Sequence, residues 1–266
     1  MLKDVTFGQY YPTTSFVHKM DPRVKIILLI AYIVAVFIAN DFIGLAAVLL
    51  FLVLAIAFAG VPPTLVLKSI KAIIFLVVFT FILNVFFHTK QEGDTVLFWV
   101  VTKEGLLSAA FLSARLILLV TGCSLLSLTT TPVNLTDGIE SLLKPLSAIR
   151  FPVHELALIM SIALRFIPTL ANEADRIIMA QKARGAAFDS GNPLKRVKAL
   201  IPVLIPLLVS AFRRADELGN AMDARCYSGS KNRTKYKKLT LSYRDLVGAI
   251  VSAALIVGIV FINIYL

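Results

Sequence analysis

The sequence contains few residues of the kinds that usually perform chemistry. It has three histidines and two cysteines among 266 residues, and the histidines His18, His88 and His154 lie far apart. It has no glycine-rich GxxxxGK[ST] loop, which excludes nucleotide binding by a P-loop. It also has no HExxH motif, CxxC cluster or carboxylate pair that would indicate a metal centre or acid–base catalysis. These absences predict a chain that is not an enzyme and that holds no metal or cofactor.

Apolar residues, by contrast, are in excess. They make up 58% of the chain, with a mean hydropathy of +0.84, whereas a soluble domain has about 45–50%. The excess therefore needs a solvent other than water. The net charge of +11 indicates anionic lipid, nucleic acid or a basic cytoplasmic face. Nucleic acid is the least favoured of these partners in so apolar a chain.

Five apolar stretches approach the length that crosses a bilayer, roughly 20 residues with a range of about 17–25. They are residues 24–39, 42–59, 70–87, 105–130 and 246–262. The sequence therefore predicts an all-α integral membrane protein with about five transmembrane helices. Its expected division is four transmembrane helices in residues 1–130, a cytoplasmic domain in 131–243 and a final transmembrane helix in 244–266.

The distribution of basic residues predicts the orientation in the membrane. The long segment 131–243 holds 17 basic and 9 acidic side chains, and the connection between the first two stretches holds no lysine or arginine. Basic residues also gather before the first stretch and between the second and third: Lys3, Lys19, Arg23, Lys25, Lys68 and Lys71. We therefore expect a multi-pass protein of the cell membrane with a cytoplasmic N-terminus and an extracellular C-terminus.

Arg115 is the one charged residue deep within a predicted span. Such a residue marks an ion or substrate path in some membrane proteins. No acidic partner lies in any span, which makes a proton or ion relay a poor interpretation. We favour an arginine that faces the helix bundle and binds backbone carbonyls.

The segment 131–243 is too long for a structureless loop. Its pattern predicts a short amphipathic helix over 134–143 and two long helices over 151–184 and 193–225. Proline lies in the first turn of both long helices, where its missing N–H group costs nothing. Each long helix is apolar in its first half and charged in its second half. We therefore expect each helix to be buried against membrane or a partner at one end only.

The two long helices repeat each other at an offset of 41 residues. The shared pattern is Ala-Asp-x4-Ala-x2-Ala-Arg, formed by Ala174, Asp175, Ala180, Ala183 and Arg184 in the first helix and by Ala215, Asp216, Ala221, Ala224 and Arg225 in the second. Small residues permit close approach of another protein, and an arginine at a helix C-terminus offers a planar fork to carboxylates or carbonyls. The repeat predicts two similar docking sites.

The sequence resembles the transmembrane T component of energy-coupling factor (ECF) transporters over nearly its whole length. The resemblance rests on four stretches, each of which alone would be weak. They are residues 15–25 at the entry to the first span, 128–146 around the short helix, 165–168 with 180–185, and 221–226.

The resemblance implies a division of labour. Two ABC-type ATPases bind the T component from the cytoplasm, and a small membrane S component captures the substrate. In the family an x-Arg-x tripeptide at the end of each coupling helix contacts an ATPase. These tripeptides correspond here to Ala183-Arg184-Gly185 and Ala224-Arg225-Cys226. Cys226 stands where the family often has glycine, which puts the geometry of that helix end in question.

The resemblance also implies vitamin uptake when a T component is shared between S components, and cobalt or nickel uptake in dedicated systems. The overall pattern favours the shared type. A conventional ABC importer permease is a further alternative, although it would carry one coupling helix per chain. From other classes, an intramembrane enzyme lacks paired catalytic residues, and a passive lipid-binding scaffold would use the basic run 231–238.

Overall fold

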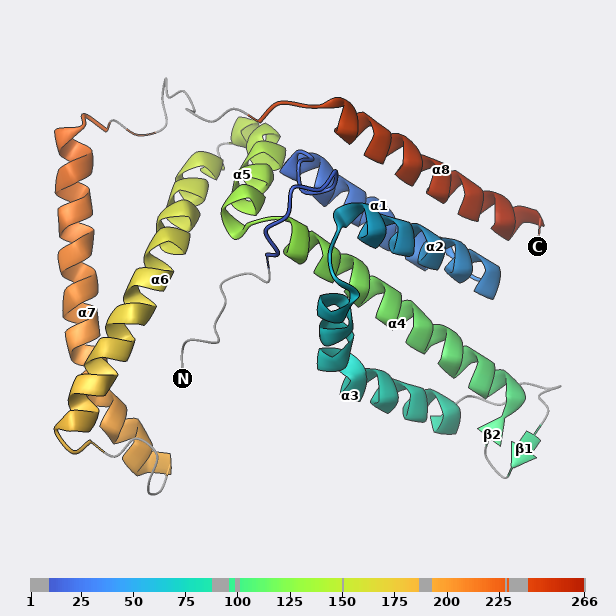
Figure 1. The fold of residues 1–266 in the computed structure, drawn as a ribbon, viewed down its shortest axis with the longest axis horizontal. Coiled ribbons are helices and arrows are strands. Elements are labelled where there is room, and N and C mark those ends of the chain that lie inside the picture. The colour runs from blue at the N-terminus through green and yellow to red at the C-terminus, as the bar shows by residue number, and fades with distance from the viewer. Residues whose placement is uncertain are drawn as a thin grey trace. The chain divides into compact units, whose positions relative to one another are not determined.

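The computed structural model describes residues 10–87, 96–98, 101–149, 151–186, 193–227, 229 and 239–265. Helices dominate the described part of the chain (Figure 1). In order they are α1 (Pro22–Ile38), α2 (Phe42–Ala59), α3 (Pro63–Phe87), α4 (Lys103–Thr129), α5 (Pro132–Leu143), the 3-10 helix η1 (Lys144–Ile149), α6 (Val153–Ala183), α7 (Pro193–Ala224) and α8 (Tyr243–Tyr265). A short antiparallel pair of strands, β1 (Val96–Phe98) and β2 (Val101–Thr102), precedes α4.

The predicted all-α membrane architecture is confirmed. Among the described residues, five helices are long and apolar enough to cross a bilayer: α2, α3, α4, α6 and α8. The sequence had instead assigned a span to residues 24–39, where α1 has only 17 residues and a length of about 25 Å. That length is at the lower limit for a span. Helix α6, whose first half is apolar, is instead the fifth candidate span.

Helix α1 packs in one bundle with α2, α4 and α8, and α3 packs on α4. Tyr32, Ala35 and Val36 of α1 are buried against Val48 of α2 and Leu118 of α4. The Tyr32 hydroxyl donates a hydrogen bond of 2.8 Å to the Leu118 carbonyl. One face of α1 is therefore part of the same bundle as the longer helices, whereas its other face, with Ile27, Ile30 and Phe37, is exposed.

One end of this bundle is held together by a polar cluster of Asp21, Arg23, Lys25 and Asp245. The Lys25 ammonium group donates to the Thr129 carbonyl at 2.9 Å and to the Thr130 hydroxyl at 3.2 Å, which places a positive charge at the C-terminus of α4. Asp245 of α8 accepts hydrogen bonds from the backbone N–H groups of Asp21 and Ser242. The cluster therefore ties the starts of α1 and α8 to the end of α4.

Arg115 lies toward the other end of the same bundle. Its guanidinium group donates a hydrogen bond of 2.6 Å to the carbonyl of Ala39, the C-cap residue of α1. It also lies over the Phe111 ring, 4.7 Å from the ring centroid. Asn263 of α8 donates to the neighbouring carbonyl of Ile38. Arg115 thus faces the bundle and caps a helix, in agreement with the interpretation favoured from the sequence.

The chain divides into two compact units by its internal packing. One comprises residues 8–141 and 239–266, and the other comprises residues 1–7 and 142–238. The first holds the bundle just described, and the second holds α6 and α7. The domain limits expected from the sequence, at residues 130 and 244, and the cytoplasmic position of the segment between them stay predictions.

The segment before α1 supplies a prediction of pH dependence. The His18 ring bonds to the Ser15 hydroxyl at 2.7 Å and to the Tyr11 carbonyl at 2.9 Å, and burial lowers its pKa from 6.5. The unfolded chain therefore binds this proton more readily than the folded chain. The contribution of His18 to the free energy of unfolding should be complete above about pH 6.5, and it should fall as the pH is lowered toward the pKa of His18 in the folded protein. Thermal unfolding of purified protein between pH 7.5 and 5.5 measures this loss, and His18→Asn should reduce it. An unchanged slope in this variant would contradict the assignment.

Candidate functional site

The C-terminus of α6 has a defined hydrogen-bonded cap. Helix α6 ends at Ala183, Arg184 is its C-cap residue, and Gly185 follows with a φ of +88°. The Gly185 N–H group donates to the Lys182 carbonyl, and the Ala186 N–H group donates to the Gln181 carbonyl, both at 3.0 Å. This pair of bonds is the Schellman motif. It leaves the Arg184 side chain exposed at the end of the helix.

The C-terminus of α7 has the same cap, 41 residues later. Arg225 follows the last helical residue, and Cys226 has a φ of +56°. The Cys226 N–H group donates to the Asp223 carbonyl at 2.9 Å, and the Tyr227 N–H group donates to the Met222 carbonyl at 3.1 Å. Cys226 is the one non-glycine residue with positive φ among the described residues. The helix end at Cys226 therefore has the same hydrogen bonds and left-handed backbone as the helix end at Gly185.

Cys226→Gly is expected to stabilise the α7 cap by about 1 kcal/mol, because a left-handed backbone costs a non-glycine residue roughly that much. The measurement is amide hydrogen exchange at Tyr227, whose protection should rise about fivefold. Cys226→Ala is the matched control, since it removes the thiol and keeps the strain. If the alanine variant gains as much protection as the glycine variant, the backbone explanation is wrong.

Helices α6 and α7 pack against each other in opposite directions (Figure 1). Glu173 of α6 forms an ion pair with Arg214 of α7 and accepts a hydrogen bond of 2.8 Å from the Ser210 hydroxyl. Gln181 of α6 donates to the Pro202 carbonyl of α7. As the residue number rises on α6 it falls on α7, which is the mark of an antiparallel pair.

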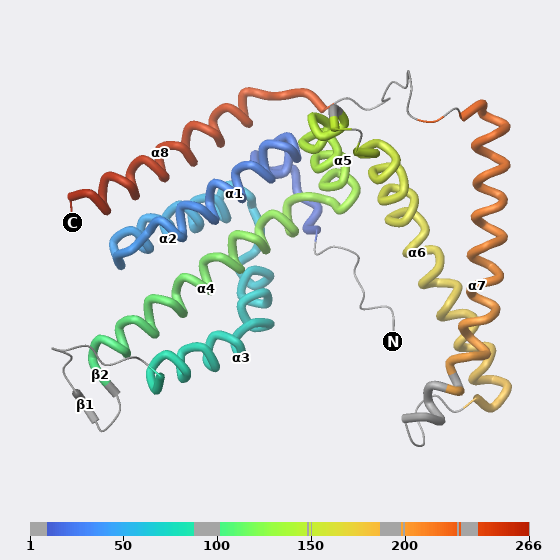
Figure 2. Tube along the Cα trace, turned by 180° about the vertical axis from the view of Figure 1, so that it is seen from behind, coloured from blue at the N-terminus to red at the C-terminus, as the bar shows by residue number. Residues whose placement is uncertain are grey.

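The ion pair joins two equivalent positions of the repeat, because Glu173 and Arg214 are separated by 41 residues. Arg184 lies 11 residues after Glu173, and Arg225 lies 11 residues after Arg214. At about 1.5 Å per residue, each arginine lies roughly 16 Å from the ion pair, and in opposite directions. Figure 2 shows the two helix ends pointing away from each other. The two arginines are thus separated by on the order of 30 Å, at opposite ends of the pair.

Arg214→Glu is expected to weaken the α6–α7 contact, because it sets two carboxylates together where an ion pair stands in the wild type. The exchanged variant Glu173→Arg/Arg214→Glu should recover part of this loss. Thermal unfolding of the wild type, both single variants and the double variant gives the coupling energy directly. Additive losses would show that the two charges do not interact in solution.

The remaining residues of the predicted repeat also lie along these two helices. Ala180 and Ala221 are exposed, as are Ala183 and Ala224, and Asp216 is more exposed than Asp175. The structure does not bring the two arginines together; it separates them. Sequence reasoning missed the Glu173–Arg214 pair, although two opposite charges at the same repeat position were a visible signal.

Within the described residues, no group of three histidine, cysteine, aspartate or glutamate side chains is placed to hold a metal ion. The expectation that the chain binds no cofactor and performs no catalysis stays a prediction. The basic run 231–238, the basis of the lipid-scaffold alternative, lies outside the described residues.

Comparison with known proteins gives consistent results. A family model described as "Cobalt transport protein" matches residues 13–236. The energy-coupling factor transporter transmembrane protein EcfT of Clostridium kluyveri is 50% identical over 259 residues, which are 96% of each chain. EcfT of Ruminiclostridium cellulolyticum is 49% identical over 93% of this chain and 92% of its own. EcfT of Bacillus subtilis is 45% identical over 96% of this chain and 98% of its own.

These matches extend over nearly the full length of this chain and of each relative. They include both helix ends described above. The relatives are named as transmembrane subunits of a transporter, which fits the apolar helices and a multi-pass position in the membrane. The chain therefore belongs to the EcfT family, the transmembrane T components of energy-coupling factor transporters.

Proposed function

We propose that the chain couples two cytoplasmic ABC-type ATPases to a membrane-embedded S component that carries the substrate. Each ATPase binds one helix end: Ala183-Arg184-Gly185 of α6 or Ala224-Arg225-Cys226 of α7. ATP is bound and hydrolysed by the ATPases, and the chain transmits their movement. Asp175, Ala180, Asp216 and Ala221 support these ends as the preceding positions of the repeat.

The observation that carries the proposal is the equivalence of the two helix ends. Both end in the same Schellman motif and expose an arginine directly before the left-handed residue. The ends point in opposite directions from an ion pair at equivalent repeat positions. A pair of similar ATPases related by a twofold axis is the partner that such an arrangement fits. When ATP binding brings the ATPases together, the force reaches α6 and α7 at both arginines.

The apolar halves of the same helices are the proposed contact for the S component. On α7 a stripe of large apolar side chains is exposed at helical spacing: Leu200, Ile201, Leu204, Ile205, Leu208, Val209 and Phe212. On α6 the exposed residues Leu156, Ile159 and Met160 form a similar surface. Exposed apolar stripes of this size indicate a protein or membrane contact. Movement of the arginine ends would therefore shift the surface on which the S component rests.

For the cargo we propose vitamins, with cobalt or nickel ions as the alternative. The relatives at 40–50% identity carry the general energy-coupling factor name, whereas the family model carries a cobalt transport description. The substrate would be selected by the S component, so the chain's own residues do not distinguish these cargoes.

The test is purification of the intact complex from native membranes through a tag on this chain, followed by mass spectrometry and reconstitution in vesicles. Recovery of two ABC-type ATPases, a small membrane protein and ATP-dependent uptake of a labelled vitamin supports the proposal. Uptake of cobalt instead supports the alternative cargo. Uptake by this chain and the ATPases alone would favour a conventional permease and overturn the coupling role.

A further inference from the structure

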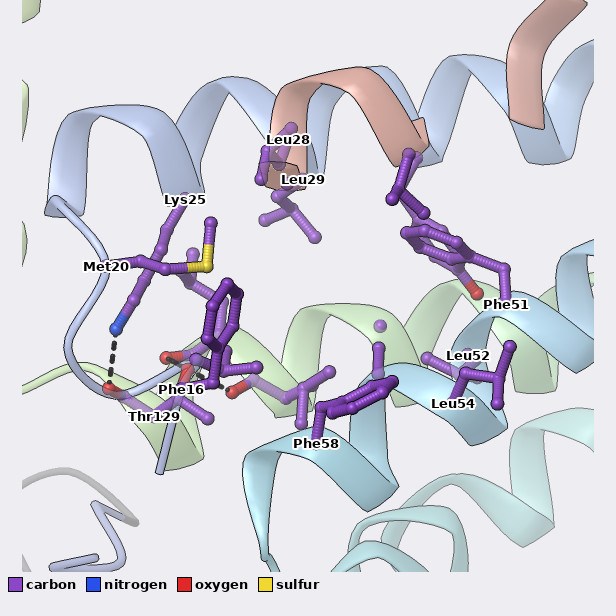
Figure 3. A pocket seen from close by; sticks show the side chains of 18 of the residues that line it. Phe16, Met20, Lys25, Leu28, Leu29, Phe51, Leu52, Leu54, Phe58 and Thr129 are labelled. Carbon is purple, nitrogen blue, oxygen red and sulfur yellow. Dashed lines mark hydrogen bonds between the residues drawn. The ribbon is translucent and has the colours of Figure 1, made fainter. Parts of the chain in front are cut away.

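A pocket with a volume of about 380 Å³ lies within the bundle formed by α1, α2, α4 and α8. Figure 3 shows Phe16, Met20 and Leu29 from the N-terminal segment and α1, with Phe51 and Phe58 of α2 across the cavity. The last turns of α4 and the first turns of α8 complete the wall. A ligand pocket of this size and apolar, aromatic lining is typical of sites for small apolar groups.

The few polar side chains in the wall already have partners. Lys25 donates to the Thr129 carbonyl (Figure 3), Tyr32 donates to the Leu118 carbonyl, and the Thr129 hydroxyl donates to the Leu125 carbonyl. A buried water needs two to four polar partners. Because these groups are satisfied within the protein, the pocket suits a hydrocarbon chain far better than water.

The pocket also has access to the bilayer. Leu54 and Phe58 of α2 and Val247 and Val251 of α8 line the cavity, and all four are exposed at the surface of the bundle. Both helices are long and apolar enough to span a membrane. The groups that surround this entrance in a bilayer are acyl chains.

Positive charge lies at the polar end of the pocket. Arg244 precedes the lining residues Val247 and Gly248 by three and four positions on α8, and therefore shares their helix face. Lys19 is exposed and immediately precedes the lining residue Met20. The carboxylates of Asp21 and Asp245 are buried, and the basic side chains of Arg23 and Lys25 interact with them. Because these two negative and two positive charges offset each other, Lys19 and Arg244 leave a net positive charge at this end. A phosphate group complements this charge.

We propose that the pocket binds one acyl chain of an anionic phospholipid whose phosphate lies at Lys19 and Arg244. The lipid would fill the space between the N-terminal segment, α2 and α8, against the last turns of α4. This site differs from the ATPase and S-component surfaces proposed above, and it does not rest on them.

The first test fills the pocket and counts bound lipid. Ala55→Phe places a ring in the cavity from α2, and Ala57→Phe places the same ring at an exposed position of that helix outside the lining. After incubation with vesicles of equal parts phosphatidylcholine and phosphatidylglycerol, native mass spectrometry should find one phosphatidylglycerol on the wild type and on Ala57→Phe. Retention by Ala55→Phe should fall at least about tenfold, because two or more methylene groups lose their site. Equal retention by both variants, or none by the wild type, overturns the proposal.

The second test examines the charge. Lys19→Gln/Arg244→Gln should remove the preference for phosphatidylglycerol over phosphatidylcholine, whereas Lys68→Gln/Lys71→Gln, at exposed lysines of α3, should leave it unchanged. An unchanged preference in the first variant overturns the assigned phosphate position.

A third test needs no substitution and so does not depend on the folding of a variant. Phosphatidylglycerol with a photoreactive acyl chain should label the peptides that contain Phe58 and Val251 more strongly than the exposed residues of α3. Uniform labelling of all spans overturns the proposal. In the assembled complex, cross-linking of the pocket residues to a membrane protein would identify the pocket as a protein contact and overturn it as well.

Discussion

Arg184→Glu/Arg225→Glu is expected to abolish ATP-dependent uptake and to release both ATPases from the purified complex. Each substitution reverses a charge at an exposed helix end, and like charges across an interface cost several kcal/mol. A loss of at least about tenfold in affinity is expected at each end. The measurements are co-purification of the ATPases and uptake in reconstituted vesicles.

The single variants separate assembly from coupling. One intact end still holds one ATPase, and a second ATPase bound to the first is retained by the linked contact. We therefore expect Arg184→Glu or Arg225→Glu alone to keep much of the assembly and to lose most of the uptake, because only one end is then moved. Arg213→Glu, at an exposed position of α7 before the helix end, is the control and should resemble the wild type. Full assembly and uptake in the double variant would disprove the role of both arginines.

Gly122→Ala is expected to cause the largest loss of stability by a single added methyl group. A Cβ atom at Gly122 would lie 2.2 Å from Cε1 of Tyr32, and the Tyr32 ring is held by its hydrogen bond to Leu118. The ring must move, which costs about 1–3 kcal/mol through overpacking and about 1 kcal/mol through the lost bond. Thermal unfolding in detergent should show a midpoint lowered by several degrees.

Gly258→Ala in α8 is the matched control, because no atom lies within 4 Å of the added Cβ. It should be neutral or slightly stabilising, since alanine is the better helix former. Tyr32→Leu combined with Gly122→Ala should recover part of the loss, because the smaller side chain clears the contact. A double variant no more stable than Gly122→Ala would show that the Tyr32 ring is not the obstacle.

Much of the fold was accessible from sequence because a bilayer imposes length and composition on its helices. The apolar runs of α2, α4 and α8 were assigned with ends close to those observed. The predicted span began at residue 70, whereas helix α3 begins at Pro63. The prediction missed the first two turns because Lys68 and Lys71 lower the local hydropathy there. The sequence placed α6 in the cytoplasmic segment. The structure shows that α6 is long enough, and apolar enough over part of its length, to be a candidate span.

The candidate site was predicted in part. The 41-residue repeat singled out Arg184 and Arg225, because similar local sequences form similar helix ends. Its consequence at Cys226 was not predictable, because sequence alone does not say whether a cysteine adopts a left-handed backbone or the helix ends differently. The φ of +56° shows that Cys226 adopts the left-handed backbone. The two hydrogen bonds of the Schellman motif stabilise this conformation.

The sequence by itself determined that the chain lies in a membrane, that it carries two equivalent helix ends and that it resembles the T components. Local composition and local repeats decide these properties, so no knowledge of distant contacts is needed. Only the tertiary structure decided that Glu173 meets Arg214, that Arg115 caps α1, and that residues from 16 to 251 enclose one apolar pocket. Each of these unites residues far apart in the chain, and such contacts depend on how whole helices pack.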